Sequence, residues 1–408
     1  MPSPMQDNSV RPRVIDPVSS NAVPSWFLNQ IESVSSRSDQ FPCTAALHLF
    51  DGQTIVLGDD DPAVHLYVRN RNGLKALGSL NQLAIIEAYM RGDIDIEGDL
   101  IRAMSFQEVL NDSNLWIRTW RWLKPMFLGR VRCNPEWIQK HYDSNNIQLI
   151  HADREYNTYT PGIYDDEFDT LEEGAARKLG FAFDSLNLKA GDRVVDIGCG
   201  WGGFLRYAAR RNTKVTGITL SKDQLEYTRE RIGEEGIEGD VLYQDFFTYQ
   251  PSEPFDGISM MGVMEDLSDY ARVMNRLPHL LKPGGRVYLD FAAAKEPDPT
   301  SSFITKYVWP GTFRMVYMPE LMQAIVKSPF EIVGLYNDRR NYHLWAKKGL
   351  DRWIEQRSQI TEMTDDATWR MFAILSAGTS SVMDRRSHCA TAFRMVLELP
   401  EDAFPMQN

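Results

Sequence analysis

A glycine-rich turn follows a short apolar segment near the middle of the chain. Residues 194–203 read Val-Val-Asp-Ile-Gly-Cys-Gly-Trp-Gly-Gly, and a helical pattern starts at residue 204. Glycines tolerate positive φ and let the backbone approach a ligand closely, while the start of the next helix directs free N–H groups towards that ligand. The spacing differs from the dinucleotide pattern G-x-G-x-x-G. Because Asp196 adds a carboxylate, the turn favours the cationic amino-acid end of S-adenosylmethionine (SAM) over a pyrophosphate; a strand–helix connection without a ligand is the alternative.

Polar residues also follow the next two predicted strands. Residues 214–220 form an apolar segment that includes Thr219, and Ser221 with Gln224 has the capping-box spacing of a helix start. Thr219 and Gln224 take the place where nucleotide-binding sheets hold ribose hydroxyls. After a third strand, residues 244–246 (Gln-Asp-Phe) are suited to frame an adenine. This β-α-β order with short turns predicts the first half of a doubly wound sheet.

Five segments, in this order, resemble the motifs of one enzyme family: VVDIGCGWGG, GITLSKDQ, a Gln-Asp-aromatic turn, G-x-x-E and LLKPGGR. The family is that of the cyclopropane-fatty-acyl-phospholipid synthases, which are SAM-dependent C-methyltransferases. Three more segments are similar to it: residues 141–143 (His-Tyr-Asp), eighteen residues before Tyr159; residues 303–311; and residues 87–100, which resemble the small leading domain of longer members. The resemblance covers the chain from about residue 45 to about residue 397.

The resemblance implies an α/β fold: a doubly wound, seven-stranded Rossmann-like SAM methyltransferase sheet with a small mixed N-terminal domain. It also implies SAM as the cofactor and an unsaturated lipid or other apolar alkene as the substrate. The residues expected to bind SAM are Tyr159, Thr160, Asp196, Gly198, Gly200, Gly202, Thr219, Leu220, Gln224, Gln244, Asp245 and Phe246. The residues expected to line an apolar channel of acyl size are Pro161, Phe303 and Tyr307.

The chain departs from the family where the family binds bicarbonate. Family enzymes methylate one carbon of a cis double bond in a phospholipid acyl chain, and the carbocation then loses a methyl proton and closes a three-membered ring. A bicarbonate ion serves as the base, held by a Cys, a Glu, a His, a backbone amide and a Tyr. Here the Glu is kept as Glu265, the Cys has become Pro161, the His has become Asp290, and the Tyr falls near residues 339–342. Because a carboxylate repels an anion, we expect the bicarbonate site to be absent.

Two hypotheses follow for this pocket. In the first, Asp290 with Glu265 is itself the base, since two carboxylates in an apolar pocket share a proton and an ionised one stabilises a carbocation. The product is then a cyclopropane, or a methylated or methylene chain without a ring. In the second, the chain is catalytically silent and binds only SAM or lipid. A prenyl or polyketide alkene is the alternative substrate. For the two residues, the alternatives are a capping role for Asp290 and a structural or SAM-contacting role for Glu265.

Composition excludes several classes of protein. The chain has 408 residues, of which 43% are hydrophobic, and a net charge of −12 argues against nucleic-acid binding. The four cysteines lack pair spacing and the seven histidines lack metal-ligand spacing, which predicts reduced thiols and no metal site. No long apolar span or apolar leader is present. We therefore expect a cytoplasmic protein. The cysteines are Cys43, Cys133, Cys199 and Cys389.

The sequence divides into four parts. Residues 1–23 are interpreted as a flexible lead, 24–112 as a small N-terminal domain, 113–140 as a basic Trp-rich linker helix, and 141–408 as the methyltransferase domain. The linker at 114–132 interleaves tryptophans with Arg and Lys and holds no acid, as in helices at an anionic membrane surface; packing on the catalytic domain is the alternative. The N-terminal domain is expected to pack on the catalytic domain or to mediate a homodimer. Residues 351–397 are expected to be helices that cap the sheet.

Overall fold

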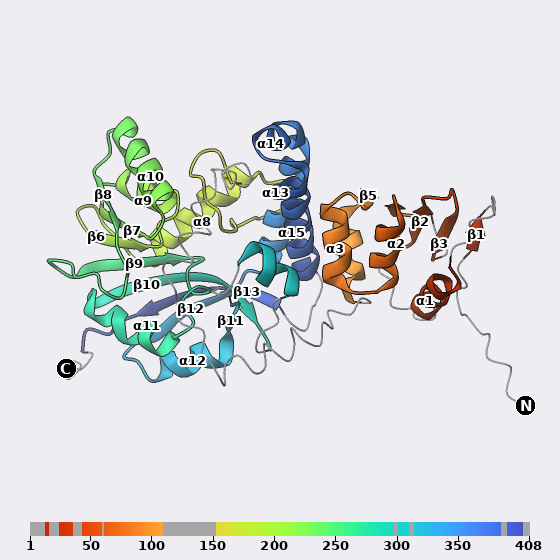
Figure 1. Cartoon of the computed structure of the whole chain (residues 1–408). Helices are drawn as coiled ribbons and strands as arrows, with labels where there is room; N and C mark the ends of the chain where they lie inside the picture. The colour runs from red at the N-terminus through yellow and green to blue at the C-terminus, as the bar shows by residue number, and fades with distance from the viewer. Residues whose placement is uncertain are drawn as a thin grey trace, which may run out of the picture. The chain divides into compact units, whose positions relative to one another are not determined.

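The computed structural model describes residues 13–15, 24–35, 43–58, 61–108, 152–296, 301–309, 314–384 and 390–402. The chain forms two compact units (Figure 1). The first unit comprises Met1–Trp122 and Ile354–Ser381, and the second comprises Leu123–Trp353 and Val382–Asn408. The predicted linker helix and the predicted 112/113 and 140/141 boundaries lie outside the described residues, as do Cys133, Cys389 and the His-Tyr-Asp segment at 141–143.

The second unit is built on a mixed sheet in the order β12-β13-β10-β9-β6-β7-β8, with β11 paired to β10. Strands β6 to β11 pair in parallel, whereas β13 runs antiparallel to both β10 and β12. The strands are β6 (Arg193–Ile197), β7 (Lys214–Thr219), β8 (Gly239–Tyr243), β9 (Phe255–Met261), β10 (Leu281–Ala294), β11 (Val316–Tyr317), β12 (Glu331–Asn337) and β13 (Ala390–Glu398). The predicted doubly wound α/β sheet is confirmed, with the two-residue β11 as an eighth strand.

Helices alternate with these strands. They are α8 (Leu171–Ser185), α9 (Gly203–Ala209), α10 (Lys222–Glu235), α11 (Tyr270–Arg276), the single turn η3 (Leu277–His279), the π-helical η4 (Ile304–Val308), α12 (Met318–Val326) and α13 (Arg339–Glu355). The predicted start of α10 is confirmed, because the Gln224 backbone N–H donates to Ser221 Oγ at 3.3 Å. This helix ends at Gly236, whose φ of 61° is the left-handed conformation that favours glycine at a helix end.

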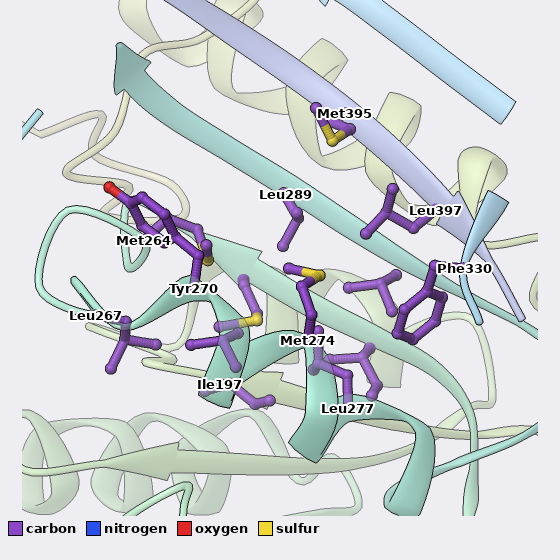
Figure 2. Close-up of a cluster of buried hydrophobic side chains, with 14 of the residues drawn as sticks. Ile197, Met264, Leu267, Tyr270, Met274, Leu277, Leu289, Phe330, Met395 and Leu397 are labelled. Carbon is purple, nitrogen blue, oxygen red and sulfur yellow. The ribbon is translucent and has the colours of Figure 1, made fainter. Parts of the chain in front are cut away.

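The core of the second unit lies on both faces of the sheet. Ile197, Leu289 and Leu397 pack with Met274 of α11 in one apolar cluster (Figure 2). Tyr288, the neighbour of Leu289 on β10, belongs instead to a cluster that includes side chains of α8 and α9. Since successive side chains of a strand point to opposite faces, helices cover both faces, as in doubly wound folds. Asp290 therefore shares the face of Tyr288, next to α8.

The first unit is a five-stranded sheet in the order β1-β3-β2-β4-β5, with helices. Its elements are β1 (Arg13–Ile15), α1 (Ser25–Ser35), β2 (Ala45–Leu49), β3 (Thr54–Leu57), β4 (Val64–Val68), α2 (Arg71–Gly78), α3 (Gln82–Met90), β5 (Ile94–Gly98), α4 (Leu100–Ser105), the single turn η2 (Phe106–Glu108), α14 (Arg357–Met363) and α15 (Asp366–Asp384). β2 and β3 form an antiparallel hairpin around Asp51 and Gly52, whose φ of 92° requires glycine. This is the hairpin that the Asp-Gly pair indicates.

Two regions differ from the sequence-based expectations. Residues 13–15 of the predicted flexible lead form β1, which pairs antiparallel with β3. Within 351–397, residues 390–398 form strand β13 rather than a helix, and Ile354–Ser381 belongs to the first unit. β13 is buried along most of its length between β10 and β12. A buried strand is apolar on both faces, so its periodicity does not distinguish it from a buried helix.

Candidate active site

The glycine-rich turn leaves open space at one position. Gly198, Gly200 and Gly202 all have positive φ, of 69°, 53° and 78°. A Cβ at Gly198 would lie 2.5 Å from Val263 Cγ2, and one at Gly202 would lie 2.4 Å from Thr228 Cγ2. A Cβ at Gly200 would meet nothing within 4 Å. The outer glycines therefore permit close packing, while the middle one presents backbone to a space that a ligand could fill.

Asp196, at the end of β6, is buried next to the open turn. Ser259 Oγ donates to Asp196 Oδ1 at 2.8 Å. Burial raises the pKa of Asp196 to about 7, against the opposing effects of the Ser259 hydrogen bond and the Lys178 charge. A cation bound nearby favours the ionised carboxylate and reverses such a shift. Asp196 thus has the environment of a carboxylate that a cationic ligand would complete.

The predicted ribose and adenine residues lie at the ends of β7 and β8. Thr219 Oγ1 donates to Gln224 Oε1 at 2.9 Å, and both side chains are buried, next to the half-buried Leu220. The Gln244 backbone N–H donates to the Thr219 carbonyl at 3.1 Å, which ties the two strand ends together. The half-buried Asp245 accepts from the Phe247 backbone N–H at 2.7 Å.

Phe246, predicted to frame the adenine, is buried in the apolar core of the second unit. Its ring centroid lies 4.9 Å from that of Phe247, which is only partly buried. The contact of Phe246 with a cofactor remains a prediction.

The two predicted catalytic carboxylates are brought together by β9 and β10. Glu265 follows β9 and its Oε1 accepts from the Ala292 backbone N–H at 2.7 Å, two residues beyond Asp290 on β10. Among the described residues, Glu265 Oε2 has no hydrogen-bond partner although it is buried. Burial, reinforced by the nearby charge of Asp290, raises the pKa of Glu265 to about 8. Both carboxylates therefore lie close together in a poorly solvated part of the protein interior, which is called the acidic pocket below.

Lys178 of α8 lies in this pocket, and the sequence analysis missed it. Its Nζ lies 2.8 Å from Asp290 Oδ2 and donates to Thr160 Oγ1, and the side chain is 1% exposed. The sequence does carry a signal for Lys178: this lysine lies on the apolar stripe of a helix, beside Leu179 and between Ala175 and Ala182. A lysine on such a stripe is almost never fully buried unless it is paired.

A second buried ion pair lies on the same face. Arg394 Nε of β13 lies 2.8 Å from Asp338 Oδ2. Burial raises the pKa of Asp338 to about 6, with Arg394 opposing this and Asp290 reinforcing it. Tyr342 of α13, in the region predicted for the family tyrosine, is buried near Glu265 and Asp290, and its pKa is raised well above the ordinary value chiefly by burial.

Taken together, these side chains give the pocket an excess of acid. Four buried carboxylates face two cations. The carboxylates are Asp196, Glu265, Asp290 and Asp338, and the cations are Lys178 and Arg394. Such a pocket attracts positive charge in a poorly screened environment. It therefore fits the sulfonium and ammonium groups of SAM and a carbocation.

The other predicted residues lie in two places. Tyr159 packs edge-on against Trp345 of α13 with ring centroids 6.1 Å apart, and burial raises its pKa to about 12. Pro161 is buried in the segment that leads into α8. Phe303 and Tyr307 pack with ring centroids 6.0 Å apart, on and beside the π-helical turn η4.

Two features of the described residues bear on other functions. No group of three or more His, Cys, Asp or Glu side chains there has the arrangement of a metal site. No helix in that part of the chain is long and apolar enough to cross a membrane.

Comparisons with known proteins agree with this geometry. A family model described as mycolic acid cyclopropane synthetase matches residues 130–391, and a domain of unknown function matches residues 33–114. A probable fatty acid methyltransferase of Pseudomonas putida is 27% identical over 355 residues, which are 83% of this chain and 88% of the relative. Sphingolipid C9-methyltransferase 1 of Gibberella zeae is 22% identical over 329 residues, 76% of this chain and 64% of the relative.

A solved structure shows the same fold. A mycolic acid cyclopropane synthase complexed with SAH and CTAB matches with a TM-score of 0.61 at 19% identity, covering 65% of this chain and 99% of that one.

Proposed function

The chain belongs to the mycolic acid cyclopropane synthetase family and is a SAM-dependent methyltransferase, and we propose that it methylates an alkene carbon in an unsaturated lipid chain with its own carboxylates as the base. The residue changes at Pro161 and Asp290 remove two of the bicarbonate ligands that the family resemblance implies. A pair of carboxylates then takes the role of the missing anion.

The observation that carries this proposal is the pairing of Glu265 with Asp290. Glu265 Oε1 already accepts the Ala292 backbone N–H, so a protein carboxylate uses a donor that an external anion would need. Glu265 Oε2 is buried and lacks a partner among the described residues. Buried polar groups that lack partners are rare and call for an explanation. A role of the Glu265–Asp290 pair in accepting a proton would explain why this oxygen lacks a partner.

The reaction balances with these groups. When bound, SAM supplies an electrophilic methyl group. The alkene π electrons form the new C–C bond, the S–C bond breaks, and positive charge develops on the neighbouring carbon. Because the pKa of Glu265 is raised to about 8, the Glu265–Asp290 pair shares one proton at neutral pH. Its ionised carboxylate stabilises the positive charge and accepts one proton from the product cation. Loss of a proton from the new methyl group closes a ring, and loss from a chain carbon gives a methylated alkene.

We further propose that the SAM contacts are made at the strand ends. Gly200 offers open backbone, Asp196 faces the amino-acid end, and Thr219 with Gln224 reaches the ribose. Leu220, Gln244 and Asp245 would complete the adenine side. Pro161, Phe303 and Tyr307 would line the lipid channel. Membrane contact through residues 114–132 and a homodimer stay predictions.

The preferred substrate is a fatty acyl chain of a phospholipid. This choice is supported by the similarity to the probable fatty acid methyltransferase of Pseudomonas putida, which spans most of both chains. A sphingoid alkene is the second candidate, because the chain is also similar to a sphingolipid C9-methyltransferase. Both substrates present an isolated alkene in an aliphatic chain, and they differ in the head group.

The test incubates the purified full chain with CD3-labelled SAM and either monounsaturated phospholipids or an unsaturated ceramide. Mass spectrometry of the lipids identifies the methylated class. Three retained deuteriums indicate a methylated alkene, and two indicate a ring or a methylene group. Turnover should be unchanged in buffer depleted of bicarbonate. A tenfold or larger drop on depletion would overturn the carboxylate base, and no labelled lipid with SAM binding intact would redirect the search to prenyl or polyketide alkenes.

A further inference from the structure

The first unit contains an apolar cavity that the methyltransferase reaction does not use. Its volume is about 110 Å³, and it is partly open. One wall is the sheet, with residues such as Ala45, Leu47 and Ile96, and the other is formed by helices α1, α2, α3, α4 and α15 and the turn η2. The eighteen lining residues that the structure describes all belong to the first unit. The cavity is therefore a property of that unit alone.

The lining is almost purely aliphatic. Among the described lining residues, only Gln82, Gln107 and Tyr89 carry a polar side-chain atom, and none carries a charge. Gln82 Nε2 donates to Gln107 Oε1 at 3.1 Å, so the two amides partly satisfy each other. An apolar cavity of this kind stays dry and admits apolar guests. A ligand must therefore present an uncharged hydrocarbon to the interior and leave any charged group outside.

Two features set this cavity apart from a packing defect. Protein interiors contain few voids larger than a water molecule, and an apolar void lowers stability in proportion to its volume. Leu80, on the cavity wall, also has a φ of 50°, a left-handed conformation that leucine rarely adopts. Strained residues of this kind gather at ligand sites. An empty volume and a strained wall residue at the same place together point to a ligand.

We propose that this cavity binds one aliphatic chain of a lipid or fatty acid. Most of the lining residues are leucine, isoleucine, methionine and alanine, which suit a flexible hydrocarbon better than a flat ring. A volume of 110 Å³ accommodates a segment of several carbon atoms, and the rest of the chain extends through the open side. The first unit is thus an alkyl-chain-binding domain in its own right. The proposal does not depend on methyl transfer.

Photolabelling of the purified full chain tests the proposal. The probe is a saturated fatty acid with a diazirine near its methyl end, and labelled peptides are identified by mass spectrometry after digestion. We expect labelled peptides from residues 74–107. Because the probe has no alkene, this result is independent of whether the protein methylates any lipid. Labelling confined to the second unit, or absent altogether, would overturn the proposal.

Three variants assign the label to the cavity. Ala103→Phe fills the volume from α4, and Leu80→Asn keeps a residue that tolerates positive φ while adding a polar amide to the wall. Each should lower labelling of the first unit by about fivefold or more. Ala84→Phe, also at a half-buried helical alanine but off the cavity wall, is the matched control. Equal labelling of Ala103→Phe and Ala84→Phe would contradict the cavity site. Circular dichroism and SAM affinity verify that each variant is folded.

Discussion

Two buried charged side chains, Arg370 in the first unit and Asp290 in the second, are satisfied in different ways. Arg370 of α15 pairs with Asp95 at 2.5 Å and with Asp366, and it donates to the Tyr89 carbonyl at 3.2 Å. Asp290 pairs with Lys178 and lies within reach of the Tyr288 hydroxyl, but no backbone N–H of the described residues donates to its oxygens. Arg370 therefore has a full set of partners, whereas Asp290 keeps unused acceptor positions.

This difference separates a structural charge from a candidate catalytic one. Arg370 connects α15 to the end of β5, so its bonds join segments of the first unit that lie far apart in the chain. Asp290 lies with Glu265 in a pocket that has more carboxylates than cations, and this pocket awaits positive charge. Because buried polar groups normally find partners, incomplete satisfaction is the better guide to function than burial.

The largest effect is expected at Asp290. Asp290→Asn keeps the shape of the side chain but removes the charge that stabilises the cation and accepts the proton. Turnover should fall by roughly 100-fold to 10,000-fold, while the Kd for SAM changes by no more than about twofold, since other residues hold SAM. Steady-state kinetics and calorimetric titration measure the two quantities. Turnover within tenfold of the unsubstituted chain would exclude Asp290 as a catalytic residue.

Lys178→Met should destabilise the second unit by about 3–5 kcal/mol, because it leaves Asp290 buried without its partner. The double variant Lys178→Met with Asp290→Asn should recover most of that loss, since both charges are then gone. Urea denaturation of the single and double variants gives the coupling free energy. Independent, additive losses would show that the Lys178–Asp290 contact is energetically unimportant.

Arg370→Met tests the first unit. The variant removes the donors that Arg370 directs to Asp95 and to the Tyr89 carbonyl, while Arg69 still pairs with Asp95. We expect a loss of about 2 kcal/mol with SAM affinity unchanged. Arg357→Met is the control, because Arg357 pairs with the same Asp366 at the surface and should cost about 0.5 kcal/mol or less. A parallel fall in SAM affinity would mean that Arg370 also supports the second unit, and its role would then not be confined to the structure of the first.

The smallest effect is a change in pH dependence at Glu265. Its pKa of about 8 in the folded chain lies above the ordinary value of 4.5, so between these pH values the folded state holds a proton that the unfolded state has released. The free energy of unfolding therefore falls as pH rises through this window, by up to about 1.4 kcal/mol per pH unit.

Glu265→Gln removes this contribution and should flatten the curve. Denaturation at pH 5.5, 6.5 and 7.5 compares the two proteins, while Asp196 and Asp338 contribute equally to both. Parallel curves would show that Glu265 is not protonated in the folded chain.

The sequence by itself determined the doubly wound sheet and the residues at its strand ends. Apolar segments, the glycine turn at 198–202 and the Ser221 cap are local patterns whose backbone requirements can be read along the chain. The family resemblance also indicated Glu265 and Asp290 as a pair, because they stand where the family has two of its bicarbonate ligands. The sequence-based prediction failed at β13, whose apolar run resembles a buried helix, and at residues 13–15, where pairing with β3 orders a segment without periodicity of its own.

Only the tertiary structure decided which distant side chains meet. Lys178 reaches Asp290 because α8 covers the face of β10 that carries residues 288 and 290, and no local pattern specifies which helix covers which face. Likewise, α15 joins the first unit through Arg370, and the apolar cavity exists because helices from both ends of the chain leave space above one sheet. Such contacts depend on packing between segments far apart in the sequence. The burial that this packing produces decides the protonation of the carboxylates in the site.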